Sequence, residues 1–343
     1  MRIFSVTSMK DEGPFLLEWI AYHRLIGVTD FLIFSNDCSD GTDAMLDALS
    51  AAGVVSHVRQ TVDPEKGAQW QALAAAWKHP TRKAADWMLF SDVDEFPFIK
   101  TGTHHLADLV AALPDGTAAV TLPWRLFGAG GVLVFRDLPV TAQFNWCAPP
   151  GLLHPIAASM FKTLFRPESF RAAGIHRPKR HKDAVPPQWV DGAGAALPES
   201  FAMQDGRLSL LGLSEGRALA EMHHYSLRSA ESFIVKSARG LANRKGKSID
   251  LSYWVERNFN TERNEVMQFW AEPLAAEIAV LKALPGVGAL HATACDWHRA
   301  AFAAAVQTGE GYRLYCHCLH AGSSDVLPRP LALRLLHMFG ELK

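Results

Sequence analysis

The stretch DWMLFSDVDEF, residues 86–96, decides the fold and the chemistry that this sequence predicts. The apolar run WMLF is typical of a buried strand, and it leads directly into three acidic residues. Alternate side chains of an extended chain point the same way, so we expect Asp92 and Asp94 to project together from the carboxyl end of this strand and Glu95 to face the opposite side. Two hard oxygen ligands at such a place can hold Mg²⁺ or Mn²⁺ and leave positions for a diphosphate.

In the chain before this stretch, segments with the apolar pattern of strands alternate with segments with the apolar pattern of helices. Strands are predicted at residues 2–8, 29–34, 54–59 and 85–99, and helices at residues 12–27, 44–53 and 68–79. Strands that alternate with helices indicate an α/β fold, with a mostly parallel sheet flanked by helices.

The pattern loosens after residue 100. A helix at 105–113 and a strand at 118–124 are followed by a segment rich in Pro, Gly and basic residues, with short β-like pieces such as SFAMQDGRLSL (200–210). A helical tail follows, with helices predicted at residues 230–242, 261–284, 296–306 and 327–343.

Bulk composition limits the function classes. The chain has 343 residues, of which 49% are hydrophobic and 20% charged, and its net charge is -1, so nothing favours nucleic acid as a partner. The amino terminus lacks a signal-peptide pattern, and no run approaches the roughly 18 apolar residues that span a bilayer, so we expect a cytoplasmic protein. Residues 327–343 are amphipathic, with Arg329 and Arg334, which favours a helix that packs its apolar face on the core. Peripheral contact with the inner face of a membrane is the alternative.

The five cysteines are odd in number and mostly scattered, which favours reduced thiols over a disulfide framework. Cys316 and Cys318 form one tight cluster with His317 and His320. Tetrahedral zinc sites normally use two separated pairs of ligands, so a zinc site within this cluster is disfavoured.

The segment SNDCSDGTDAM, residues 35–45, crowds acidic and small residues between a predicted strand and a predicted helix. It is compatible with a capped turn, because Asp, Asn and Gly serve helix amino termini. A calcium loop would need Cys38, a soft ligand, among its first three ligands. A third interpretation is a ligand pocket, because open α/β sheets bind ligands beyond the carboxyl ends of their strands.

Six segments, taken in order and spacing, resemble the glycosyltransferase family 2-like proteins related to the family 92 glycosyltransferases. The resemblance covers roughly residues 1–245. The segments are MKDEGPFLLEWIAYHRLIGVTDFLIFSNDCSDGT (9–42), QWQALAAAW (69–77), DWMLFSDVDEF (86–96), WRLFGAGG (124–131), KTLFRPE (162–168) and HHYSLRSAESFIVKSARG (223–240).

This resemblance implies a GT-A glycosyltransferase domain at residues 1–245, with a nucleotide-binding part at about 1–120 and an acceptor part at about 121–245. Residues 246–343 would then be a helical C-terminal extension. In such enzymes a Mn²⁺ or Mg²⁺ ion on the D-x-D motif bridges the diphosphate of a nucleotide sugar, here most simply a UDP-sugar. The sugar passes, usually with inversion, to a hydroxyl of an acceptor such as a glycan or glycolipid.

The resemblance also assigns residues to the site. Asp92 and Asp94 would bind the metal, with His223 or His224 as a third ligand. Lys236 and Arg239 would neutralise the diphosphate or face solvent. Asp11 replaces the Asn usual in the family. The donor pocket would be lined by Thr7, Lys10, Glu12, Asn36, Asp37, Asp40, Gln69, Gln71 and Asp92.

Inversion by direct displacement requires a base near the acceptor hydroxyl, because the attacking oxygen loses a proton as the bond forms. The open candidates are Asp137, Asp191, Glu199 and Glu221, and Glu95 is less favoured. Two other functions compete. A nucleotidyltransferase would need a Gly-rich, basic loop after the first strand, where this chain has only Lys10 and Gly13. The other is a non-catalytic carbohydrate-binding protein on the same fold.

Overall fold

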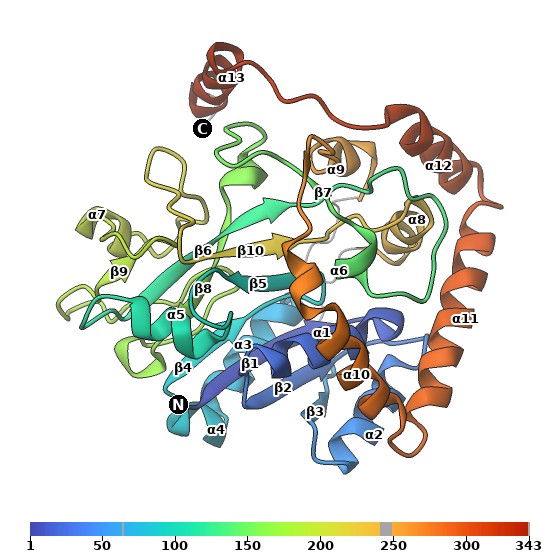
Figure 1. The fold of residues 1–343 in the computed structure, drawn as a ribbon, viewed down its shortest axis with the longest axis horizontal. Helices are drawn as coiled ribbons and strands as arrows, with labels where there is room; N and C mark the ends of the chain where they lie inside the picture. The colour runs from blue at the N-terminus through green and yellow to red at the C-terminus, as the bar shows by residue number, and fades with distance from the viewer. Residues whose placement is uncertain (64, 241–248, 342–343) are drawn as a thin grey trace.

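A nine-stranded sheet forms the centre of the molecule (Figure 1). The computed structural model describes residues 1–63, 65–240 and 249–341. The strand order is β3-β2-β1-β4-β8-β6-β10-β5, and β9 pairs with β6. The strands are β1 Ile3–Met9, β2 Asp30–Ser35, β3 Ser56–Arg59, β4 Trp87–Phe90, β5 Glu95–Ile99, β6 Ala119–Leu126, β8 Phe161–Phe165, β9 Trp189–Val190 and β10 Ala220–His224. A separate antiparallel pair joins β7 (Trp146–Cys147) to β11 (Glu262–Arg263).

The first half of the chain builds the parallel part of the sheet. Strands β1 to β4 pair side by side in parallel, and helices connect them, as the alternating pattern predicts. The antiparallel strand β8 lies between β4 and β6, and β5 closes the far edge against β10. The helices of this half are α1 Gly13–Leu25, α2 Thr42–Ala51, α3 Ala68–Lys78, α4 Pro80–Ala84 and α5 Leu106–Ala112.

The centre of the sheet is buried on both faces, which explains why β2 and β4 are almost continuously apolar, whereas the edge strand β3 is mostly exposed. In β2, Ile33 belongs to one apolar core and Phe34 to the other, because successive side chains of a strand point to opposite faces. Helices α1, α2, α5, α10 (Ala271–Lys282) and α11 (Val287–Ala305) cover the first core, and α3 and α7 (Glu199–Ala202) cover the second.

The prediction of one strand over residues 85–99 is wrong. The chain turns after Phe90, where the amide of Glu95 donates to the carbonyl of Asp92 at 3.0 Å, and β5 then runs along the opposite edge of the sheet. The expected alternation of Asp92, Asp94 and Glu95 in an extended strand therefore does not hold, because a tight turn redirects each side chain.

The second half is more irregular, as expected, and its last elements are helical. The β-like interpretation of residues 200–210 is wrong at its start, which is helical, and α11 begins well before residue 296 because Gly286 ends the preceding turn in a left-handed conformation (φ 78°). The remaining elements are α6 Val140–Gln143, α7 Glu199–Ala202, α8 Ala230–Arg239, α9 Leu251–Val255, α10 Ala271–Lys282, α11 Val287–Ala305, α12 Gly309–Ala321 and α13 Arg329–Glu341, with 3-10 turns η1 Ile156–Ser159, η2 Pro167–Ser169 and η3 Val266–Trp270.

Helices α10 and α11 pack on α1, and an ion pair of 2.7 Å joins Arg24 to Glu277. The boundary predicted between residues 245 and 246 lies outside the described residues. Among the helices that the structure describes, none is by itself long and apolar enough to cross a bilayer. The segments Val266–Lys282 and Val287–Ala305 meet that length and composition only as a pair, with a bend of 105° between them.

Candidate active site

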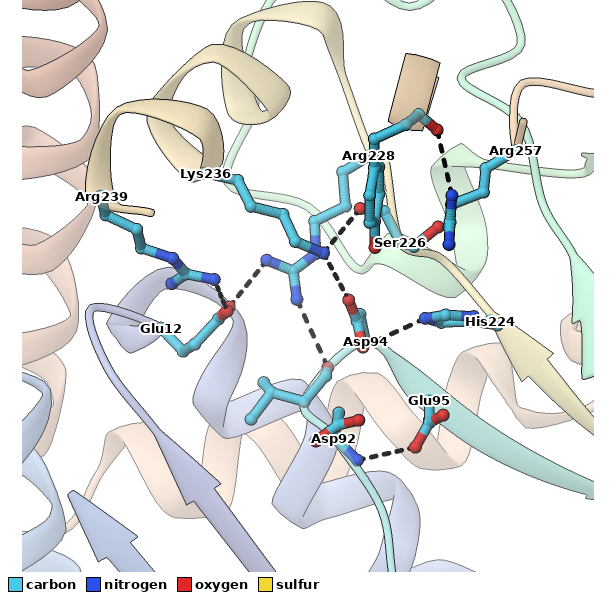
Figure 2. A network of polar contacts seen from close by, with 12 residues as sticks. Glu12, Asp92, Asp94, Glu95, His224, Ser226, Arg228, Lys236, Arg239 and Arg257 are labelled. Atoms are coloured by element: carbon cyan, nitrogen blue, oxygen red, sulfur yellow. Dashed lines mark hydrogen bonds and ion pairs between the residues drawn. The ribbon is translucent and has the colours of Figure 1, made fainter. Parts of the chain in front are cut away.

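Acidic and basic side chains converge where β1, β4 and β10 end (Figure 2). The loop after β1 supplies Glu12, and the turn after β4 supplies Asp92, Asp94 and Glu95. Opposite them, the end of β10 supplies His224, the loop after it supplies Arg228, and helix α8 supplies Lys236 and Arg239. Parallel strands bring their carboxyl ends to one edge, so segments distant in sequence meet there.

Asp94 lies between a lysine and a histidine. Its Oδ2 accepts a hydrogen bond of 2.8 Å from Lys236 Nζ, and its Oδ1 lies 3.6 Å from His224 Nε2. Burial alone would raise the pKa of Asp94, but Lys236 and His224 outweigh it and hold the pKa well below its usual range. Burial lowers the pKa of His224, against the raising effect of Asp94.

Asp92 points to a different set of partners. Its two oxygens bind Gln69 Nε2 at 2.8 Å and Lys162 Nζ at 3.0 Å. Lys162 is fully buried and also contacts Glu95 at 3.2 Å, and the carboxylate of Glu95 accepts a hydrogen bond from the Asp92 amide at 2.8 Å. Burial and the neighbouring acids raise the pKa of Glu95 to about 8 against the effect of Lys162. Glu95 thus shares a lysine with Asp92 instead of facing away from it.

Glu12 sits between two arginines. Arg228 Nη1 donates to its carboxylate at 2.8 Å, and Arg239 donates to the other oxygen and to the carbonyl of Asp11 at 2.8 Å. Burial would raise the pKa of Glu12, but Arg239 and Arg228 outweigh it and hold the pKa at about 2. Arg228 also lies 3.5 Å from the ring centre of Phe15, which fixes its guanidinium.

Asp40 ties two helices together in the loop after β2. Its carboxylate accepts hydrogen bonds of 2.8 Å from the amide of Gly13 and from the amide of Thr42, the first residues of α1 and α2. Asp11 accepts hydrogen bonds from the amide and hydroxyl of Ser39. The capped-turn interpretation therefore holds for Asp40, and Asp11 binds the same loop from the loop after β1. The ligand atoms of Asp11, Cys38 and Asp40 also lie within 4.8 Å of one another, a grouping that could hold a metal ion.

The other predicted donor contacts lie around this loop. Thr7 and Asn36 are buried, and Thr7 Oγ1 and Asn36 Oδ1 have no hydrogen-bond partner among the described residues. Asp37 is exposed and Lys10 half-buried. Gln71, unlike Gln69, turns away from Asp92 and binds the backbone of Asp63 and Lys66.

Four further candidates are not brought to this cluster. His223 faces the opposite side of β10 from His224 and lies 3.2 Å from Glu221, which also contacts Lys100. Asp191 accepts backbone hydrogen bonds from residues 193, 195 and 216. Asp137 lies against α11, where it binds His291.

Two residues of the cluster were missed or misjudged from the sequence. Arg228 falls inside the HHYSLRS segment, but nothing local to it indicates a partner in the loop after β1. Glu95 was placed on the wrong side, because its position depends on the turn after β4.

The model of glycosyltransferase family 92 matches residues 3–191, more than half of the chain. The chain belongs to glycosyltransferase family 92. A family 92 protein of Ricinus communis is 26% identical over 242 residues, and one of Arabidopsis thaliana is 30% identical over 240 residues. Each alignment covers 69% of this family 92 chain and 37% of the relative, so the chain spans little more than a third of these relatives' length.

Solved structures are more distant from this family 92 chain. The mannosyltransferase PcManGT of Pyrobaculum calidifontis, in complex with GDP-Man and Mn²⁺, is 14% identical with a TM-score of 0.33, over 93% of this chain and 85% of that one. S. aureus TarS, residues 1–349, is 13% identical with a TM-score of 0.34, over 90% of this chain and 92% of that one.

Proposed function

We propose that this chain transfers a sugar from a nucleotide-sugar donor, most simply a UDP-sugar, to a hydroxyl of a glycan or glycolipid acceptor. One observation carries the proposal within the family. Asp94 of the turn after β4, His224 of β10 and Lys236 of α8 meet at the carboxyl ends of the strands. The alternatives, a nucleotidyltransferase and a non-catalytic carbohydrate-binding protein, do not account for this convergence together with the family match.

Asp94 and His224 suit a divalent metal ion. Their facing atoms, 3.6 Å apart, are too distant for a hydrogen bond but close enough to share one ion. A carboxylate and an imidazole suit Mn²⁺, and metal sites that also hold phosphates commonly use only one or two protein carboxylates. When bound, the ion would supply positive charge at the diphosphate leaving group. Asp92 is directed to Gln69 and Lys162, so we assign it to the donor and not to direct metal contact.

The cations around the cluster have a role in the same proposal. Lys236 and Arg228 contact Asp94 and Glu12, which also fix them in position. A diphosphate that enters beside them would meet prearranged positive charge, which stabilises the charge that develops on the leaving group without reorganisation. Glu95 and Lys162 are fully buried, so they position Asp92 and do not touch the substrate.

We further propose transfer with inversion. Asp137, Asp191 and Glu221 are each committed to other partners away from the cluster, as described above, and Glu199 lies at the start of α7. These placements favour none of the predicted bases. The anomeric configuration of the product, followed by NMR during turnover, tests inversion directly.

Calorimetric titration with UDP in the presence and absence of Mn²⁺ tests the metal and the donor together. We expect Mn²⁺-dependent binding, and we expect Asp94→Ala to weaken it on the order of 100-fold, about 3 kcal/mol, because a charged partner of the bound group is lost. Asp115→Ala is the matched control, since Asp115 is an exposed carboxylate in the loop between α5 and β6.

Binding of UDP that ignores Mn²⁺, or that survives Asp94→Ala unchanged, would contradict the proposal. Formation of a nucleotide sugar from a nucleoside triphosphate and a sugar phosphate would favour the nucleotidyltransferase. Glycan binding without turnover or hydrolysis of any nucleotide sugar would favour the carbohydrate-binding protein.

A further inference from the structure

A second group of metal-ligand side chains lies outside the proposed reaction site, where α11 packs against the loop after β6. Asp137 on that loop and His291 and Cys295 on α11 each offer one ligand atom, and these atoms all lie within 4.8 Å of one another. Two histidine or cysteine ligands spaced four residues apart share one face of a helix, so α11 presents His291 and Cys295 together.

The three ligand atoms lie close to one another. Nε2 of His291 lies 2.8 Å from Asp137 Oδ1 and 3.6 Å from Cys295 Sγ. The second oxygen of Asp137 is 3.4 Å from Lys282 Nζ, an outer contact that orients the carboxylate and leaves Oδ1 facing the histidine.

Burial and access both suit a bound ion. His291 and Cys295 are only 4% and 3% exposed, so their ring and thiol are held in place by the core. The side chain of Asp137 is 41% exposed, which leaves a path from solvent and room for a water ligand.

The set of donors identifies the class of metal. A thiolate and an imidazole are soft or borderline ligands that select zinc over Mg²⁺, Ca²⁺ or Mn²⁺. Three protein ligands with sulfur, nitrogen and oxygen donors, completed by water, form a normal four-coordinate zinc site. The single tight cluster of Cys316 and Cys318 on α12 is not among the groups with converging ligand atoms in the described part of the chain.

We propose that Asp137, His291 and Cys295 bind a zinc ion that ties α11 to the loop after β6. Binding releases the thiol proton of Cys295 to solvent and leaves the imidazole proton on Nδ1, so that sulfur and Nε2 each donate a lone pair. With a thiolate, a carboxylate and Zn²⁺, the site carries no net charge.

The same loop is attached to the helix that carries Lys236 and Arg239. The amides of Ala230 and Glu231, at the start of α8, donate to the carbonyls of Val132 and Leu133 at 3.1 and 3.0 Å. The ring of Phe135 packs on His298 of α11, with ring centres 4.4 Å apart. The zinc ion therefore braces α8 through this loop, and it does so whether or not the proposed sugar transfer is correct.

Zinc analysis and cobalt substitution of the full chain test the site. We expect about one Zn²⁺ to be retained per chain after dialysis, and the Co²⁺ form to show a sulfur-to-metal charge-transfer band in the near ultraviolet. Cys295→Ser should abolish the band. His291→Ala should weaken Zn²⁺ binding by more than about 10-fold, because the loss of a residue that only supports a metal ligand already costs about 10-fold. Cys316→Ser, at a half-buried cysteine of α12, is the matched control and should retain both signals.

Wild-type protein that binds no Zn²⁺ and gives no charge-transfer band with Co²⁺ overturns the proposal, and this result depends on no variant. Loss of the band in Cys38→Ser with retention in Cys295→Ser also overturns it, because the metal then belongs to the group of Asp11, Cys38 and Asp40. Asp94→Ala should leave the zinc content unchanged, which separates this site from the proposed donor site. Circular dichroism identifies any variant that loses metal only because it fails to fold.

Discussion

At the scale of single residues, Glu12 is a buried carboxylate whose contribution to stability depends on its partners. It is the common partner of Arg228 and Arg239, and all three side chains are at most 16% exposed. Removal of one member of a buried ionic group is costly because the others keep their charge without compensation.

We therefore expect Glu12→Gln to reduce the free energy of unfolding by about 3 kcal/mol, measured by urea denaturation at neutral pH. Asp296→Asn is the control. That residue forms an ion pair with Arg299 on the surface of α11, with side chains 79% and 51% exposed, and exposed pairs contribute little. Equal stability losses for the two variants would show that the Glu12 contacts add nothing beyond a surface pair.

At the same scale, the sequence identifies the carboxylates but not which of them act together. The D-x-D pattern correctly singles out Asp92 and Asp94 as unusual acids after an apolar strand. It predicts the wrong geometry, because the extended-chain argument ignores the turn that lets Glu95 bond back to Asp92. A local pattern reports residue types, whereas a tight turn depends on where the next strand must go.

At the scale of elements, Asp40 connects the amino termini of α1 and α2, two successive helices separated in the chain by β2. Unpaired amides at a helix start are normally satisfied by a local side chain, but neither α1 nor α2 has a capping side chain at its own N-cap position. One carboxylate supplies both bonds, and its negative charge lies at the positive ends of both helix dipoles.

We expect Asp40→Ala to destabilise the protein by about 2 kcal/mol, the upper range for loss of a helix cap, because two amides lose their acceptor at once. Hydrogen exchange should show faster exchange at Gly13 and Thr42. Asp43→Ala, which removes an acid of the first turn of α2 that is more exposed than Asp40, should leave the Gly13 amide protected. Unchanged protection at Gly13 in Asp40→Ala would refute the shared cap.

At the scale of the whole molecule, the core buries several neutral histidines. Burial lowers the pKa of His23 and His298 to about 3, and Arg228 adds to the effect at His298. The unfolded chain takes up protons on these residues near pH 6.5, whereas the folded protein does not. Stability is therefore complete above pH 6.5 and is lost as the pH falls from 6.5 toward 3.

The predicted result is a loss of stability from pH 6.5 to pH 5, with each such histidine contributing a slope of up to about 1.4 kcal/mol per pH unit. Glu95, with its pKa raised to about 8, opposes this trend, because the folded protein takes up its proton more readily than the unfolded chain. The contribution of a histidine is therefore measured by comparing the wild type with a variant that lacks it. His298→Gln should flatten the dependence of the unfolding free energy on pH, while His320→Gln, at an exposed position on α12, should not. Parallel pH curves for His298→Gln and the wild type would contradict the assignment.

The choice between His223 and His224 also belongs to the whole molecule. Neighbouring residues of a strand face opposite sides, so one of them had to point away from the acidic turn. Which one does so is decided by the pairing of β10 with β5, which sets His224 opposite Glu95 and His223 opposite Phe96. The two adjacent histidines give no information in the sequence about the register of β10 against β5.

The sequence by itself determined the order of strands and helices up to residue 79, the apolar strands of the buried part of the sheet, and the family. These follow from periodicity, turn residues and motif order, which act over a few neighbouring residues. Only the tertiary structure decided that Asp94 meets His224 and Lys236, that Glu12 pairs with Arg228 and Arg239, and that Asp137 lies against α11. Those pairs join segments that lie far apart in the sequence, and their distances depend on strand register and helix packing.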